Sequence, residues 1–141
     1  MTHGETGIWE TDFALNNHTE ASELAQAISD ILPRDQPVAD FGSGVGYYSR
    51  TIQANGFDVL AIDGTPDLEK AGIFSPILVK DLSEPLILEE RRNVVCLEVG
   101  EHIPNEFEAG ILDNITRNAK EMVIMSWAIP GQGGTGHVDE Q

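Results

Sequence analysis

Four residues in the second half of the chain have side chains that bind cations or carry protons. Glu98, Glu101 and His102 lie within five residues, directly after the apolar stretch 94–97, and His137 follows in a glycine-rich segment. Carboxylate oxygens combined with one or two imidazoles suit divalent cations such as Mg²⁺ or Mn²⁺. If the four side chains converge, they predict a metal site at Glu98, Glu101, His102 and His137.

The same residues also fit a pocket that holds no metal. There the acidic groups would contact a substrate or cofactor, and Glu98 or His102 would serve as a general base. In either case the catalytic candidates are Glu98, Glu101 and His102, and the sequence leaves both alternatives open.

A second candidate site is the loop Asp40–Gly46, with the sequence Asp-Phe-Gly-Ser-Gly-Val-Gly. It follows an apolar stretch and precedes a helical pattern, so its glycines allow a sharp turn and a close approach of a ligand to the helix N-terminus. Dinucleotide-binding loops have the spacing Gly-x-Gly-x-x-Gly, but here Tyr47 stands at the third glycine position. No lysine follows as it does in loops that bind nucleoside triphosphates.

Acidic residues also follow the next two apolar stretches of the chain. Asp63 ends the stretch 57–62, at a place where a carboxylate can accept both hydroxyls of a ribose. An ordinary turn aspartate before Gly64 is the alternative interpretation. Asp81 and Leu82 follow the stretch 74–79 in the same way, and a solvated loop acid is the alternative for Asp81.

An alternation of strands and helices must position these residues. The patterns predict a helix over 20–32 with its N-cap among Asn17–Glu20, strands over 38–41, 57–62, 74–79, 94–97 and 122–127, helices over 47–55 and 66–71, and a helix capped by Asn105. Such an alternation predicts one α/β domain, residues 1–141, with a mostly parallel sheet and helices on both faces. Ligands of such sheets bind at the carboxyl ends of the strands.

From about Pro37 onward the chain resembles the class I S-adenosylmethionine-dependent methyltransferases, which have a Rossmann-like fold. The motif Asp-x-Gly-x-Gly-x-Gly carries this resemblance, which implies binding of S-adenosylmethionine with the adenine at Asp81 and Leu82. The implied cofactor residues are Asp40, Gly42, Ser43, Gly44, Gly46, Asp63, Asp81 and Leu82. The segments Leu97–Pro104 and Ser126–Val138 are similar to a group of small methyltransferases that are often viral or phage-borne.

The resemblance implies methyl transfer to an oxygen or nitrogen of a small molecule or a protein. The spacing Glu-x-x-Glu-His is also similar to the metal motifs of small-RNA 2′-O-methyltransferases and of ubiquinone-pathway O-methyltransferases. In those families a divalent ion holds substrate hydroxyls near the methyl donor, which implies Mg²⁺ or Mn²⁺ here.

The expected sheet lacks the C-terminal strand pair that completes a class I methyltransferase. We therefore expect the fifth strand, with Val123, Met125 and Trp127 on one face, to be an exposed edge that pairs two copies in a homodimer. The alternative functions are a truncated or non-catalytic S-adenosylmethionine-binding module and an enzyme that degrades S-adenosylmethionine.

Charge and hydropathy exclude some partners. The formal net charge is -16, from 24 acidic and 8 basic residues, which disfavours binding of nucleic acid. No stretch approaches the ~18 apolar residues of a membrane span, and no leader opens the chain. We therefore expect a cytoplasmic protein without membrane contact.

Overall fold

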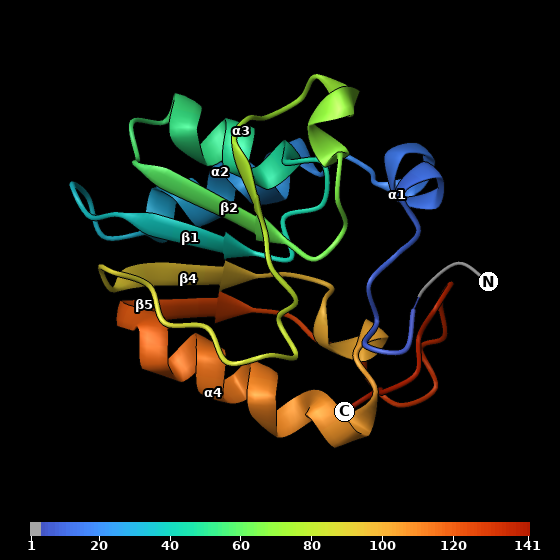
Figure 1. Cartoon of the computed structure of the whole chain (residues 1–141). Coiled ribbons are helices and arrows are strands. Elements are labelled where there is room, and N and C mark those ends of the chain that lie inside the picture. The colour runs from blue at the N-terminus through green and yellow to red at the C-terminus, as the bar shows by residue number, and fades with distance from the viewer. Residues whose placement is uncertain (1–3) are drawn as a thin grey trace.

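The computed structural model describes residues 4–141 and contains one five-stranded sheet flanked by helices (Figure 1). In chain order the elements are α1 Thr11–Asn17, α2 Ser22–Ile31, β1 Val38–Phe41, α3 Tyr47–Ala54, β2 Val59–Asp63, the 3-10 turn η1 Leu68–Ala71, β3 Ile77–Val79, β4 Arg92–Cys96, the 3-10 turns η2 Gly100–His102 and η3 Asn105–Phe107, α4 Glu108–Asn118 and β5 Ala119–Met125.

The sheet has the order β3-β2-β1-β4-β5, and every neighbouring pair of strands is parallel. The chain builds outward from β1 to β3 and then returns to place β4 on the other side of β1. In open α/β sheets this reversal leaves a crevice at the carboxyl ends of the two central strands. The expected Rossmann-like α/β fold is confirmed, and the crevice falls where β1 and β4 end.

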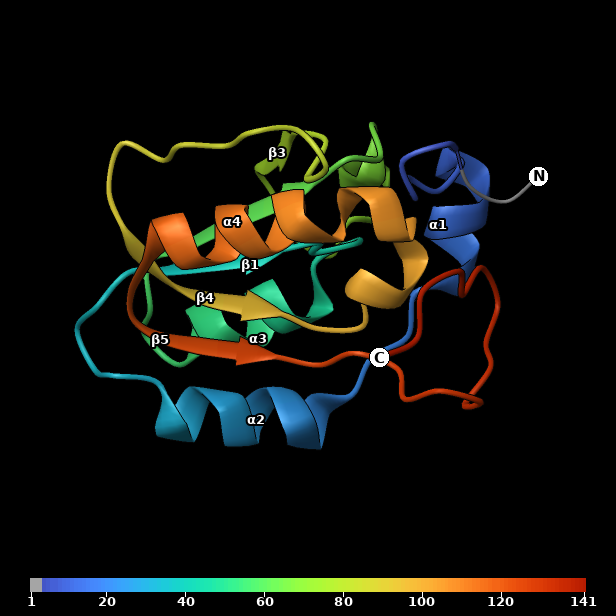
Figure 2. The same cartoon turned by 90° about the horizontal axis from the view of Figure 1, so that it is seen from below.

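Helices cover both faces of the sheet, as Figure 2 shows with α4 on one side and α2 and α3 on the other. Strand residues alternate between these layers. Ala39 and Phe41 pack with Ile111 and Ile115 of α4, whereas Val38 packs with Ile52 of α3. All six side chains are almost fully buried. The two-residue period of β1 therefore divides the core into two layers.

Several helix boundaries differ from the sequence prediction. The N-cap of α2 is Ala21, which has no side-chain capping bond, so the polar residues 17–20 do not cap it. Instead Asn17 ends α1, a short helix that the sequence did not predict. Asn105 is also not the expected cap, because α4 starts only at Glu108 after a 3-10 turn. The left-handed Gly56 after α3 is confirmed, with a φ of 97°.

The connection from β3 to β4 has no helix, and two buried asparagines of α4 satisfy its backbone instead. Asn114 accepts a hydrogen bond from the N–H of Leu86 and donates to the carbonyls of Leu82 and Glu84, each at 2.8 Å. Asn118 bonds in the same manner to Leu86 and Leu88. These side chains hold the segment that follows Asp81 against α4.

β5 is an edge strand, and no strand follows it in the described part of the chain. Val123 and Met125 are 38% and 39% exposed. The prediction that Trp127 extends this exposed face is wrong, because β5 ends at Met125 and the Trp127 indole lies over Gly100. Among the helices of residues 4–141, none combines the length and the apolar character needed to cross a bilayer.

Candidate functional site

A pocket of about 250 Å³ opens at the carboxyl ends of the central strands. Its walls come from the ends of β1, β2 and β4, the connection after β3, and the N-terminal segment. The volume lies just below the range of roughly 300–1,000 Å³ that is typical of small-molecule sites. The pocket therefore occupies the place where the sheet topology predicts a ligand.

Six of the eight residues predicted to bind the cofactor line this pocket: Asp40, Gly42, Ser43, Asp63, Asp81 and Leu82. Gly44 and Gly46 belong to the same loop but do not line it. A Cβ atom at Gly44 would strike the His18 ring, and one at Gly46 would strike Phe74. Both have positive φ angles, 56° and 98°, so these two glycines allow the loop to turn under its neighbours.

Asp63 connects the end of β2 to the glycine loop. Its Oδ2 atom accepts a hydrogen bond of 2.9 Å from the Gly44 N–H, and its Oδ1 accepts one of 2.8 Å from the Thr65 N–H. Each carboxylate oxygen has a second lone pair. The side chain can therefore shape the loop and still accept hydroxyl groups from a ligand in the pocket.

Asp40 is the most deeply buried acidic group of the pocket, at 3% exposure. The Ser49 hydroxyl donates a bond of 2.7 Å to its Oδ2. Burial raises the pKa of Asp40 to about 6, the Ser49 bond opposes this rise, and the nearby Asp63 carboxylate adds to it. A negative charge at this position therefore has a large desolvation cost, which a cationic ligand group would offset.

Asp81 begins the connection that follows β3. Its Oδ1 accepts hydrogen bonds from the N–H and the hydroxyl of Ser83, at 2.9 and 2.7 Å. Leu82 beside it is 6% exposed and packs in the α4 layer of the core. A polar group and an apolar group thus meet in this part of the pocket.

The N-terminal segment forms one wall of the pocket with residues 6–9 and 17–19. The indole of Trp9 stacks on the His18 ring at 5.0 Å and meets the His102 ring edge-on at 5.1 Å. Trp9 and His18 therefore line the site, whereas Trp127 does not. The wall formed by Thr6, Gly7 and Ile8 has no signal in the sequence, because nothing periodic marks that segment.

Glu98 stands at the pocket in a conformation that is rare for a residue other than glycine. Its φ is 55°, its side chain is exposed, and its Oε1 accepts a bond of 2.7 Å from the Ser126 hydroxyl. The same hydroxyl accepts a bond from the Glu98 N–H. Ser126 therefore fixes this carboxylate at the carboxyl end of β4, and such strained residues concentrate at functional sites.

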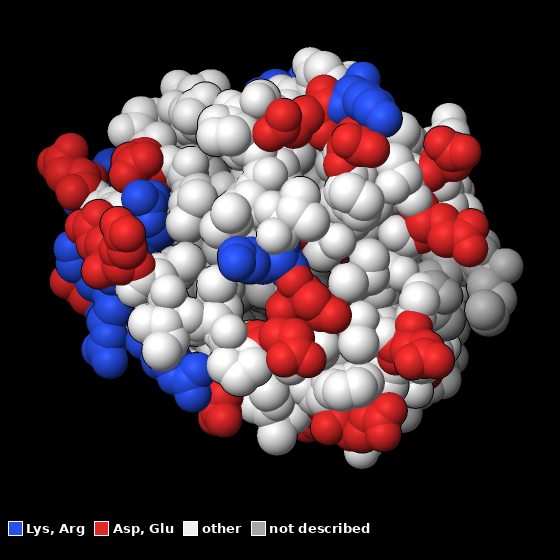
Figure 3. Space-filling model, in the orientation of Figure 1, with Lys and Arg blue, Asp and Glu red and all other residues white. Residues whose placement is uncertain are grey.

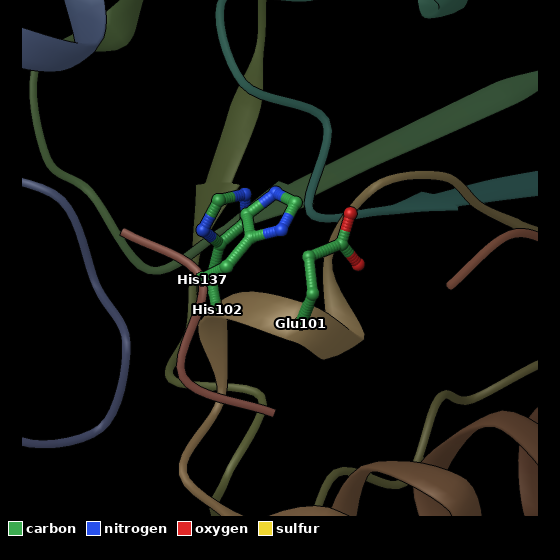
Figure 4. A group of neighbouring side chains, drawn as sticks. All are labelled: Glu101, His102 and His137. Carbon is green, nitrogen blue, oxygen red and sulfur yellow. The ribbon is translucent and has the colours of Figure 1, made fainter. Parts of the chain in front are cut away.

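Three of the four predicted metal ligands come together. Atoms of Glu101, His102 and His137 that can bind a metal all lie within 4.8 Å of one another, and Figure 4 shows the two imidazoles beside the carboxylate. Glu98 lies outside this group, bonded to Ser126. Of these residues, Glu98 and His102 line the pocket and Glu101 and His137 do not.

Glu101 is fully buried. The pKa of its carboxyl group is raised to about 7, mainly by burial and in part by the Glu98 carboxylate, while the His137 imidazole acts in the opposite direction.

The C-terminal segment 126–141 folds back onto η2 and brings His137 into place. The Glu101 carbonyl accepts bonds from the N–H groups of Val138 and Asp139, and the Trp127 indole donates to the Asp139 carbonyl at 2.7 Å. A Cβ atom at Gly100 would overlap the Trp127 ring. Glycine at this position therefore allows the C-terminal segment to pack on the turn that carries Glu101 and His102.

Solved structures of other proteins, two methyltransferases among them, have a similar fold. The glycopeptide N-methyltransferase MtfA complexed with sinefungin matches with a TM-score of 0.67 and 14% identity, over 82% of this chain and 57% of MtfA. Magnesium protoporphyrin IX methyltransferase (ChlM) from Synechocystis PCC 6803 with bound SAH matches with a TM-score of 0.63 and 22% identity, over 77% of this chain and 56% of ChlM. The PH0226 protein from Pyrococcus horikoshii OT3 matches with a TM-score of 0.62 and 19% identity, over 72% of this chain and 53% of that protein.

These comparisons concern the fold, since all three identities are below 25%. The matched part of this chain spans little more than half the length of each structure. No protein-family model and no curated protein matches the sequence. The chain has the Rossmann-like fold of the class I S-adenosylmethionine-dependent methyltransferases.

Proposed function

We propose that the protein is an S-adenosylmethionine-dependent methyltransferase that acts on an oxygen or nitrogen atom of a small molecule or a protein. The observation that carries this proposal is the pocket at the reversal of strand order, which collects the glycine loop, Asp63 and Asp81 from three successive strand ends. Similar structures contain bound S-adenosylmethionine or SAH.

The pocket residues fit the cofactor in charge and in hydrogen-bonding capacity. S-adenosylmethionine carries a sulfonium and an ammonium group, and Asp40 and Asp63 place two carboxyl groups beside the glycine loop. Asp63 would hold the ribose hydroxyls, and Asp81 with Leu82 would hold the adenine.

Figure 3 shows acidic side chains spread over one face of the molecule, with Lys and Arg gathered mainly at the left edge, where the strands begin.

The cofactor would supply an activated methyl group, which leaves its sulfur as an acceptor lone pair forms the new bond. The protein then has to align the acceptor and remove its proton. Glu98 and His102 are the candidates for that base because both line the pocket. Glu101 is fully buried and does not line the pocket, so we expect it to act through its neighbours rather than on the acceptor itself.

The acceptor class follows from the charge of the protein. A net charge of -16 repels phosphate backbones, so a small molecule or a protein is favoured over nucleic acid. Trp9 and His18 form an aromatic wall of the pocket, against which an acceptor would lie.

The test is calorimetry with S-adenosylmethionine, followed by product analysis. We expect saturable binding, no change of the cofactor when it is incubated with the protein alone, and release of SAH with transfer of a labelled methyl group when cell extract supplies acceptors. Absence of binding would overturn the proposal. Conversion to methylthioadenosine without an acceptor would replace it with an enzyme that degrades the cofactor, and binding without transfer in any extract would replace it with a non-catalytic module.

A further inference from the structure

The cluster of Glu101, His102 and His137 joins two segments that are far apart in the sequence. Glu101 and His102 belong to η2, and His137 lies in the C-terminal segment that packs against it. Their possible ligand atoms lie within 4.8 Å of one another (Figure 4). Around a metal with bonds of about 2.1 Å, tetrahedral ligands are about 3.4 Å apart. The three groups therefore need to approach by less than about 1 Å each to share one ion.

The carboxylate of Glu101 has no hydrogen-bond partner of its own. The side chain is 0% exposed, and neither Oε1 nor Oε2 receives a hydrogen bond. Its backbone carbonyl, by contrast, accepts two bonds from residues 138 and 139. Burial of an unpaired polar group costs several kcal/mol unless a donor or a cation compensates for it. The Glu98 carboxylate also faces this group and adds to its negative charge, whereas the two imidazoles lie within 4.8 Å on the other segment. A cation shared with the imidazoles would compensate for the buried carboxylate.

Both imidazoles are oriented by acceptors on their Nδ1 atoms. Nδ1 of His102 lies 3.1 Å from the Gly136 carbonyl oxygen, and Nδ1 of His137 lies 3.1 Å from Oε1 of Glu140. Because these oxygens only accept, each Nδ1 donates a proton to its partner, which leaves Nε2 as the nitrogen of each ring that can bind a metal. Metal-binding histidines in proteins have this arrangement, with the second nitrogen bonded to a carbonyl or a carboxylate.

Glu140 is itself held in place, which makes the support of His137 rigid. Its two carboxylate oxygens accept bonds of 2.7 Å from the N–H groups of Gly131 and Gly133. These bonds and the His137 contact keep the pKa of Glu140 below its ordinary value, with His137 the main cause. The bonds of Glu140 to Gly131, Gly133 and His137 thus hold the glycine-rich loop together and keep the His137 imidazole beside Glu101.

We propose that Glu101, His102 and His137 bind a divalent transition-metal ion through one carboxylate oxygen and two Nε2 atoms. Two imidazoles and one carboxylate favour Zn²⁺, Fe²⁺, Co²⁺ or Mn²⁺ over Mg²⁺, which prefers a shell of oxygens. Three protein ligands leave at least one coordination position open. His102 also lines the pocket, so the ion would lie behind the pocket wall that this residue forms with Trp9. The proposal does not depend on methyl transfer.

The experiment is calorimetric titration of the chelator-treated full chain with Zn²⁺, supported by the visible absorption of bound Co²⁺. We expect one saturable site per chain, and binding of Mg²⁺ at least tenfold weaker than that of Zn²⁺. His137→Gln and Glu101→Gln should weaken Zn²⁺ binding at least tenfold, with circular dichroism used to check that each variant is folded.

Glu140→Gln distinguishes a built site from adventitious binding, because it retains all three ligands and weakens the bonds to His137, Gly131 and Gly133 that hold His137 in place. We expect a loss of about 10- to 100-fold in Zn²⁺ affinity, the usual range for such partners. His18→Gln is the matched control: His18 lines the same pocket but lies outside the cluster, and its substitution should leave Zn²⁺ affinity unchanged. Absence of saturable Zn²⁺ binding, or binding equally strong in the His137 and Glu101 variants, would overturn the proposal.

Discussion

The carboxylate of Asp63 accepts a hydrogen bond of 2.9 Å from the backbone N–H of Gly44, nineteen residues earlier in the chain. This bond couples the end of β2 to the turn between β1 and α3. One acidic side chain therefore both shapes the glycine loop and faces the pocket that the loop borders.

The first prediction follows from this double role. Asp63→Ala should weaken binding of S-adenosylmethionine at least tenfold, about 1.4 kcal/mol in binding free energy. Gly44→Val should do the same, because its side chain would strike His18 at a positive φ. Asp58→Ala is the control, since Asp58 is exposed at the opposite end of the sheet, paired with Arg92. Calorimetric affinities at the wild-type level for both pocket variants would contradict the assignment.

The second prediction concerns the pH dependence of stability. The pKa of Asp40 rises on folding from 3.8 to about 6, so the folded state binds this proton more tightly than the unfolded state. The contribution of Asp40 to stability is then fully present below about pH 4 and is lost as the pH rises through about 6. Asp40→Asn, which stays neutral, should match the wild type at pH 4 and exceed it at pH 8 by up to about 3 kcal/mol.

Urea unfolding at a series of pH values measures this difference. Ser49→Ala removes the hydrogen bond that lowers the pKa of Asp40, so it should shift the loss of stability to higher pH. A constant difference between Asp40→Asn and the wild type from pH 4 to pH 8 would show that Asp40 does not titrate in this range.

The third prediction tests the connection from β3 to β4. Asn114 is 1% exposed and makes three hydrogen bonds to backbone groups of residues 82–86. Asn114→Ala leaves those groups without partners and should lower the free energy of unfolding by about 3 kcal/mol. Asn105→Ala is the control, because Asn105 is exposed and its contact with Glu108 is 3.5 Å long. Equal urea midpoints for the two variants would refute this role of Asn114.

The fourth prediction concerns the edge of the sheet. We propose that two copies pair along β5, where Val123 and Met125 remain about two-fifths exposed. Light scattering at micromolar concentration should give twice the chain mass of 15.3 kDa, and Val123→Lys should give the monomer mass. Glu121→Lys serves as the control for added charge on the same strand. A monomer mass for the wild type would rule out the homodimer.

β1 and β2 could be predicted from the sequence because each is an apolar stretch that ends at glycine or aspartate. β1 has the predicted bounds, Val38–Phe41, since all four residues are buried and a glycine turn follows. α1 could not be predicted, because it buries only Ala14 and depends on a distant contact, the bond from the Thr11 hydroxyl to the Pro66 carbonyl. Tertiary contacts of this kind leave no periodic signal.

The candidate site likewise has one part that could be predicted from the sequence and another part that could not. The residues at strand ends were predictable, because parallel strands bring their carboxyl ends to one edge. The approach of His137 to Glu101 depends on backbone bonds from residues 138 and 139 to the Glu101 carbonyl. Such bonds depend on no side-chain type, so the sequence suggested the three ligands but could not show that Glu98 lies outside their group.

The turn Gly100–His102 is held from two sides. Gly7 lies directly against the His102 carbonyl, and the N–H groups of Val138 and Asp139 bond to the Glu101 carbonyl. The five strands are bonded to one another in a continuous ladder, whereas this turn depends on two peripheral segments. We therefore expect the turn and the sheet to differ in cooperativity. Local opening of either peripheral segment should cost less free energy than global unfolding, which amide hydrogen exchange of residues 100–102 and of the strands can compare.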